Sequence, residues 1–137
     1  MLTRRNLGVC AICAIAGFAA IATDEAAAQA PGGLKRTILA KTEYPDSKYA
    51  TILVVVDIDA GAIVARHTHP GVESAYVVDG AFELSVHGQP ARQVKAGDGF
   101  QVPAGVPHSA RNGDKPAKVV ATYVVEKDKP LASPAPE

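Results

Sequence analysis

The chain divides into one long apolar run near its start and a series of short apolar segments separated by turn residues. Ala50–Ile58 is rich in Val and Ile and apolar at both alternating sets of positions, which predicts a strand buried on both faces. Ala81–His87 alternates between apolar and polar side chains, which predicts a strand with one buried face. No stretch after Ala30 has a helical period, so the pattern indicates β structure.

Further short strands are predicted between clusters of Gly, Pro, Asn and Asp. They are Thr37–Thr42, Glu73–Val78, Ala91–Lys95, Phe100–Val102, His108–Arg111 and Ala117–Glu126. Short strands at turn-to-turn spacings of about ten residues predict an antiparallel sandwich or barrel.

The first segment predicts a signal peptide helix, residues 1–28, rather than part of the fold. Arg4 and Arg5 precede the apolar run Leu7–Ala22, and small residues follow it up to a cleavage site after Ala28. The run is shorter than the roughly 20 residues of a membrane-spanning helix, so a permanent anchor is the weaker alternative. We expect a periplasmic or secreted protein with no stable membrane anchor after cleavage.

The paired arginines resemble a bacterial twin-arginine signal, although Leu7 replaces the usual phenylalanine and no lysine follows. An ordinary Sec signal is the alternative. Twin-arginine export carries folded proteins, so it would suit a protein that takes up its cofactor in the cytoplasm. Cys10 and Cys13, the only cysteines, lie in the apolar run. The exported chain therefore has no disulfide and depends on its core.

Composition changes this picture little. The 14 basic and 14 acidic residues cancel, and aromatic residues are 5% with no Trp, which argues against nucleic-acid binding. Apolar residues make up 47%, which is typical of a globular domain. We expect a leader at residues 29–36, one barrel domain at 37–126, and a loose proline-containing tail at 127–137.

Three histidines and one glutamate are the candidate chemistry. His67 and His69 are two positions apart, so they share a face of an extended strand. The Pro70-Gly71 bend allows Glu73 to return beside them, and His108 begins a later strand. This mixed nitrogen and oxygen set suits divalent Mn, Fe, Co, Ni, Cu or Zn. A pair of surface histidines in a loop is the alternative, because His-x-His alone is weak evidence.

The surrounding residues resemble the two motifs of the cupin family at every fixed position. The first motif is Gly61, five residues, His67, one residue, His69, three residues, Glu73, six residues, Gly80. The second is Gly97, five residues, Pro103, one residue, Gly105, two residues, His108, three residues, Asn112. The resemblance implies an all-β fold, the cupin double-stranded β-helix or jelly-roll barrel.

The resemblance also implies roles for single residues. His67, His69, Glu73 and His108 match the metal ligands of the family. Asn112 matches its asparagine, for which we expect a structural role. The turn glycines of both motifs need positive φ or close backbone approach. His87 matches no ligand and is expected in solvent.

Alternation along the strands predicts a small, apolar interior around the metal. Residues expected to point inward are Ala65, Ala75, Val77, Ala110 and Asn112. Core packing is the favoured role of Tyr123 and Phe100, and lining the interior is the alternative. No Lys or Arg is predicted inside to hold a carboxylate or phosphate.

Three functions remain open at this point. The first is a metal-dependent dioxygenase, lyase or isomerase acting on a small organic molecule, with Glu73 as a possible base. The second is a non-catalytic module that binds a metal or small ligand, and the third is a metal-free scaffold. The expected metal is Mn or Fe if export follows the twin-arginine route, and Zn, Ni or Cu if it follows Sec. We expect a homodimer formed through Ala50–Ile58.

Overall fold

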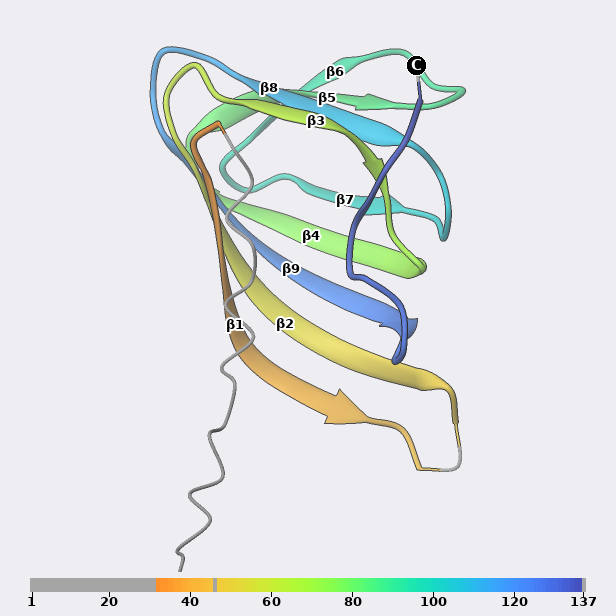
Figure 1. Ribbon diagram of the computed structural model, residues 1–137. Coiled ribbons are helices and arrows are strands. Elements are labelled where there is room, and N and C mark those ends of the chain that lie inside the picture. The colour runs from red at the N-terminus through yellow and green to blue at the C-terminus, as the bar shows by residue number, and fades with distance from the viewer. Residues whose placement is uncertain (1–31, 46, 137) are drawn as a thin grey trace, which may run out of the picture.

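The computed structural model describes residues 32–45 and 47–136 (Figure 1). The predicted signal peptide, its cleavage site and both cysteines lie outside this range. Within the described residues, no helix has the length and apolar character needed to cross a membrane.

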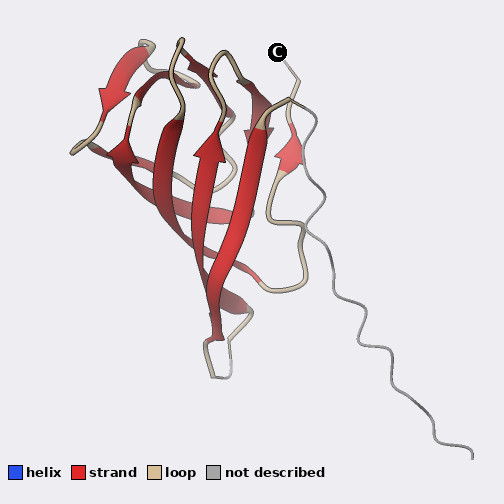
Figure 2. Ribbon diagram, turned by 90° about the vertical axis from the view of Figure 1, so that its left-hand side faces the viewer, coloured by secondary structure: helices blue, strands red, loops and turns tan. Residues whose placement is uncertain are grey.

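The described residues form β-strands connected by turns and loops (Figure 2). The strands are β1 Leu34–Glu43, β2 Tyr49–Ile58, β3 Ile63–Thr68, β4 Gly71–Asp79, β5 Ala81–Val86, β6 Arg92–Lys95, β7 Gly99–Val102, β8 His108–Asn112, β9 Ala117–Glu126 and β10 Ser133–Pro134. The predicted strands all form, with ends that differ from the prediction by three residues or fewer. Neither β3 nor β10 is among the strands predicted from the sequence.

The strands make two five-stranded antiparallel sheets that face each other (Figure 1). The order of the first sheet is β1-β2-β9-β4-β7 and that of the second is β10-β3-β8-β5-β6. Chain neighbours such as β3 and β4 lie in different sheets, so the chain crosses repeatedly between the two layers. The predicted all-β jelly-roll barrel is confirmed.

The core lies between the sheets because alternate residues of the long strands point inward. Val54 of β2 and Ala121 of β9 are paired in register and both are fully buried. The prediction for Ala50–Ile58 needs two corrections. Its second face is only half-buried, and β2 lies between β1 and β9 rather than at an edge. The edge strands of this sheet are β1 and β7, and β1 is exposed along most of its length.

The segment after β9 differs from the predicted loose tail. Ser133 and Pro134 pair with Thr68 and His67 of β3, and the amide of Ala135 donates to the Arg66 carbonyl. This segment therefore becomes the edge of the second sheet. Its pairing partner is distant in sequence, and local proline content gave no indication of it.

Candidate metal centre

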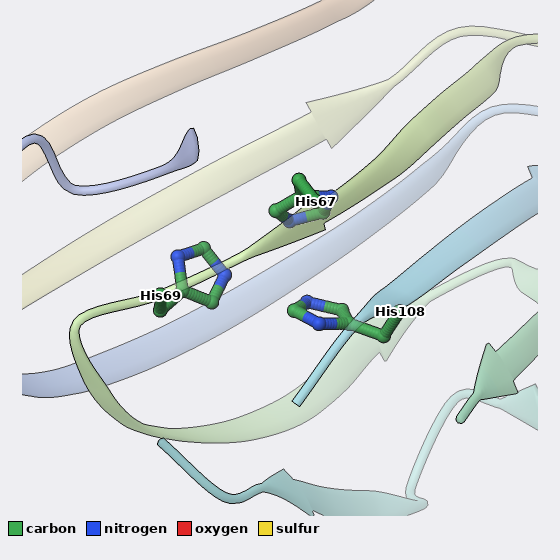
Figure 3. Close-up of side chains that lie close together, drawn as sticks. All are labelled: His67, His69 and His108. Atoms are coloured by element: carbon green, nitrogen blue, oxygen red, sulfur yellow. The ribbon is translucent and has the colours of Figure 1, made fainter. Parts of the chain in front are cut away.

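The candidate site lies between the two sheets, and strand register places its side chains. His67 and His108 are direct partners across β3 and β8 in one sheet. Glu73 and Tyr123 are direct partners across β4 and β9 in the other. The rings of the three histidines converge from β3, the β3–β4 connection and β8 (Figure 3). The sequence therefore brings the four predicted ligand residues together.

A β-bulge sets the direction of His67. The register of β3 against β8 shifts between Val64 and His67, so both residues face inward although they are three positions apart. Ala65, predicted to point inward, is exposed instead. The strict alternation assumed from sequence fails here because a bulge inserts an extra residue into one strand. Bulges often lie beside functional sites, where they redirect a side chain.

Each histidine uses its Nδ1 atom to hold a backbone carbonyl. Nδ1 of His67 donates to the Ala65 carbonyl at 2.8 Å, and Nδ1 of His108 donates to the Val106 carbonyl at 3.1 Å. Nδ1 of His69 donates to the Leu131 carbonyl at 2.6 Å, in the C-terminal segment. A carbonyl can only accept, so Nδ1 carries the proton in every ring. In the neutral rings Nε2 is left with a lone pair, which is the arrangement of metal-binding histidines.

The carboxylate of Glu73 meets these lone pairs. Its Oε2 lies 3.2 Å from Nε2 of His69 and 3.2 Å from Nε2 of His108. Nε2 of His69 is buried and, within the described residues, has no aligned hydrogen-bond partner despite that distance. Lone pairs facing each other at this separation repel unless a proton or a metal cation lies between them. Donor atoms at right angles around one ion at about 2.1 Å are about 3.0 Å apart, close to the spacing observed.

The other carboxylate oxygen of Glu73 is held by Tyr123. The Tyr123 hydroxyl donates to Oε1 at 3.0 Å, and both side chains are buried. Burial and the neighbouring carboxylate raise the pKa of Tyr123, so the phenol stays protonated as the donor. Burial alone would raise the pKa of Glu73, but hydrogen bonds from the His108 and His69 rings outweigh it and hold that pKa well below its usual range. These bonds require a proton on Nε2 in the metal-free site, and a cation bound to the neutral rings would favour the ionised carboxylate in the same way. Glu73 is therefore ionised, and Tyr123 fixes its orientation.

His67 is kept neutral at physiological pH. Burial and the neighbouring His108 ring lower the pKa of His67 from 6.5 to about 4. The donor atoms of the three histidines lie within 4.8 Å of one another. Three neutral imidazoles and one carboxylate fit a divalent transition metal better than Mg²⁺ or Ca²⁺, which prefer oxygen ligands.

A small cavity of about 50 Å³ opens beside these donor atoms. His67, His108 and Glu73 form its polar side, and most of the remaining wall is apolar, from residues such as Phe82, Leu84 and Phe100. Tyr123 also lines this cavity, which is the alternative role that the sequence left open. The space next to the candidate metal position is thus small and bordered mainly by apolar side chains.

Arg36 is the site residue that sequence analysis missed. It lies on β1, half-buried, and lines the cavity together with His67 and Tyr123. The expectation that no Lys or Arg lies inside is therefore wrong. The predicted strand began at Thr37, so Arg36 was placed in the leader. The alternation of Leu34 and Arg36 indicates that both side chains point inward if the strand begins at Leu34. Arginine is rarely buried, so its presence there suggests instead that the strand begins after it.

The other residues singled out from the sequence lie outside the cluster. The side-chain amide of Asn112 donates to the carbonyls of Ile58, Asp59 and Lys115, which is the expected structural role. His87 is exposed and accepts a hydrogen bond from Arg66 at 3.2 Å. The turn glycines all have positive φ, as expected, and they are Gly61, Gly80, Gly97 and Gly105.

Comparison with known proteins agrees with this geometry. The family model of the cupin domain (Cupin_2) matches residues 54–123, about half of the chain. No curated protein matches the sequence.

Several solved structures share the fold. KdgF from Halomonas sp. is 31% identical, with a TM-score of 0.56 over 70% of this chain and 82% of that chain. An RmlC-like cupin from Shewanella frigidimarina NCIMB 400 is 28% identical, with a TM-score of 0.58 over 73% of this chain and 83% of that one. The DMSP lyase DddQ from Ruegeria pomeroyi DSS-3 is 23% identical, with a TM-score of 0.65 over 75% of this chain. This chain spans 52% of the length of DddQ.

Proposed function

Because the chain belongs to the cupin domain family, we propose that it is a mononuclear metal protein whose ion is held by three histidines and Glu73. The observation that carries this proposal is the pairing of every Nδ1 atom with a backbone carbonyl, which turns the Nε2 atoms toward one another. Such outer hydrogen bonds fix the ring tautomer and orient a metal ligand. The ligands are His67, His69, His108 and Glu73.

We further propose an enzyme that acts on a small organic molecule, by dioxygenase-, lyase- or isomerase-type chemistry. A bound divalent metal would supply Lewis-acid polarisation of a substrate oxygen or a place for dioxygen. The apolar cavity beside the donors supports a confined reaction, because excluding water strengthens charge interactions. The likeness to DddQ is one of fold, so the reaction class is proposed from the site alone.

Glu73 is the candidate base in this proposal. Tyr123 holds one of its oxygens, and the other faces the histidine rings beside the cavity. Oε2 can accept a substrate proton if it leaves the metal, while Tyr123 keeps Oε1 in place. A Glu73→Gln variant that keeps both the metal and full turnover would exclude this role.

A non-catalytic module that binds a metal or small ligand is the alternative function. The cavity volume of about 50 Å³ favours it, since so small a space leaves little room for a substrate beside the metal. Retained metal and tight ligand binding without turnover would identify this alternative.

We propose that the protein is exported through residues 1–28 and carries Mn or Fe. An open nitrogen and oxygen site binds Cu and Zn more tightly than Mn or Fe. Metal loading in the cytoplasm followed by export of the folded protein would protect the weaker-binding ion.

The decisive measurement is metal analysis by mass spectrometry on protein recovered from the periplasm of a bacterial host that expresses the full-length chain. We expect about one equivalent of Mn or Fe in the wild type, and loss of the metal in His67→Ala/His108→Ala. His87→Ala is the matched control, because His87 is exposed and outside the cluster. It should keep the metal.

Other results have clear meanings. One equivalent of Zn or Cu would favour Sec export or a binding function over the proposed enzyme. Folded protein without metal in both the wild type and the double variant would exclude the metal site. Protein retained in the cytoplasm would exclude export.

A further inference from the structure

The entrance to the candidate metal centre is a groove that adjoins the inner cavity. The groove has a volume of about 340 Å³ and is bordered by the start of β1, by β3 and by Ala132–Pro134. Arg36 and His67 line both the groove and the cavity. A small molecule that moves from the surface to the histidines therefore passes the side chain of Arg36.

The guanidinium of Arg36 is only partly satisfied by the protein. Its Nε atom is buried and makes no hydrogen bond within the described residues. None of the ion pairs among those residues includes it. The Tyr123 hydroxyl lies within hydrogen-bonding reach of the guanidinium, and the positive charge acts on both His67 and Tyr123, two residues of the site. A buried donor without an acceptor is costly, and such a group in a native structure calls for an explanation.

The charges along the entrance favour an anion. Arg36 and Arg66 line the groove, whereas no Asp or Glu is among its lining residues. Arg66 is already engaged, because its Nε donates to the Pro136 carbonyl at 2.9 Å and its Nη2 donates to His87. The one carboxylate of the inner cavity, Glu73, is held by Tyr123 and faces the histidines. Arg36 is thus the basic side chain available to a ligand.

The surroundings of Arg36 favour a carboxylate over a phosphate. A single guanidinium matches the two oxygens of a carboxylate in a planar, two-pronged contact. The rest of the cavity wall is mostly apolar, and its volume holds only a few non-hydrogen atoms. These features fit a short carbon chain better than a sugar or a phosphate ester.

We propose that Arg36 binds the carboxylate of a small, largely apolar organic acid whose other end points toward the three histidines. This inference deepens the proposed function and rests on it for the role of the metal. The contact with Arg36 itself requires only the groove, the buried donor and the cavity described above.

The test is an NMR titration of ¹⁵N-labelled protein recovered from the periplasm and loaded with Zn²⁺. The probes are butyrate and butyramide, which have nearly the same shape but differ in charge. We expect butyrate to shift the Arg36 Nε–H resonance and butyramide to bind about 10- to 100-fold more weakly, since a charge-assisted hydrogen bond is lost.

Three variants separate a specific contact from a general charge effect. Arg36→Gln should weaken butyrate binding by about 10- to 100-fold. Arg36→Lys keeps the charge without the planar fork and should weaken binding by about threefold or more, and it carries the test if Arg36→Gln does not fold. Lys35→Gln is the matched control, because Lys35 is the exposed neighbour on the other face of β1 and its loss removes the same charge. It should bind butyrate within about twofold of the wild type.

Several results would overturn the inference. Equal losses in Lys35→Gln and Arg36→Gln would mean a general charge effect, and equal binding of butyramide would remove the role of the carboxylate. Inorganic phosphate that binds at Arg36 more tightly than butyrate would overturn the choice of a carboxylate.

Failure of this inference is distinguishable from failure of the metal proposal. Metal-loaded protein that binds no butyrate refutes only the role of Arg36. The metal site is refuted if the protein takes up no metal. If this metal-free protein still binds butyrate through Arg36, the anion site is supported.

Discussion

At the scale of single residues, the site depends on how each histidine divides its two ring nitrogens. One nitrogen is fixed to a backbone carbonyl and the other is turned toward the centre of the cluster. Glu73 divides its two oxygens in the same way, between Tyr123 and the rings of His69 and His108. The cluster is therefore arranged before any ion arrives, which reduces the ordering cost of binding.

The low pKa of His67 predicts how the stability of the metal-free protein depends on pH. The pKa is about 4 in the folded protein against 6.5 as the ordinary value. Between these values the unfolded chain binds more protons than the folded one, so the free energy of unfolding falls as the pH falls through this window. Above about pH 6.5 His67 has no such effect.

We expect the free energy of unfolding to fall by about 1 to 2 kcal/mol between pH 7 and pH 4.5, with allowance for partial exposure of the His67 ring. Urea unfolding of the metal-free protein at several pH values measures it. His67→Gln, which cannot titrate, should show a smaller fall than the wild type. The same fall in both proteins would show that His67 is not its source.

At the scale of elements, turns and irregularities position the functional residues. The bulge in β3 turns His67 inward, and the β3–β4 connection carries His69 to the other side of the cluster. The C-terminal segment supplies the Leu131 carbonyl that fixes the His69 ring. These contacts show why a local irregularity or a tail segment can matter to the site as much as a regular strand.

Gly80, at the turn between β4 and β5, provides a test of turn geometry. Its φ is +77°, and a Cβ atom there would lie 2.4 Å from the Pro116 carbonyl oxygen. Gly61 has a similar φ of +72°, but a Cβ atom there would meet nothing within 4 Å. Gly80→Ala therefore combines backbone strain with a clash, whereas Gly61→Ala adds strain alone.

We expect Gly80→Ala to lower the free energy of unfolding by about 3 kcal/mol and Gly61→Ala by about 1 kcal/mol. Chemical denaturation of the two variants beside the wild type measures the difference. An equal loss of unfolding free energy in the two variants would contradict this expectation. It would mean that movement of the β8–β9 connection relieves the clash at Gly80.

At the scale of the whole molecule, the position of β1 changes the expected assembly surface. β2 is covered on both edges by β1 and β9, so the surface predicted from Ala50–Ile58 is not available for edge pairing. β1 is one of the two edge strands of its sheet, and Ile38 and Leu39, at the irregularity in its register, are exposed at 52% and 56%. An exposed apolar edge strand favours pairing with another chain.

We therefore expect a homodimer that forms through β1. Light scattering at micromolar concentration should give a dimeric mass for the wild type and a monomeric mass for Ile38→Lys/Leu39→Lys. Val78→Lys, at an exposed position of the interior strand β4, is the control and should stay dimeric. A monomeric mass for the wild type would contradict the predicted homodimer.

The sequence by itself determined the local features of this protein. Alternation and turn residues predicted the strands, and the resemblance to the two cupin motifs implied the cluster of His67, His69, Glu73 and His108. These predictions succeed because each depends on residues that are close in sequence or on a motif of fixed spacing. The positive φ of the turn glycines belongs to the same group, since the turn itself requires it.

Only the tertiary structure decided which distant segments complete the site and which strands lie at the edges of the two sheets. The Leu131 carbonyl accepts a hydrogen bond from His69, 62 residues away in the sequence. Arg36 reaches the cavity because β1 pairs with β2 over Ala50–Ile58. Such contacts follow from the pairing of strands far apart in the chain, and the residues involved carry no local pattern that marks them. The inward direction of Arg36, and with it the proposed anion site, is set by the packing of two sheets.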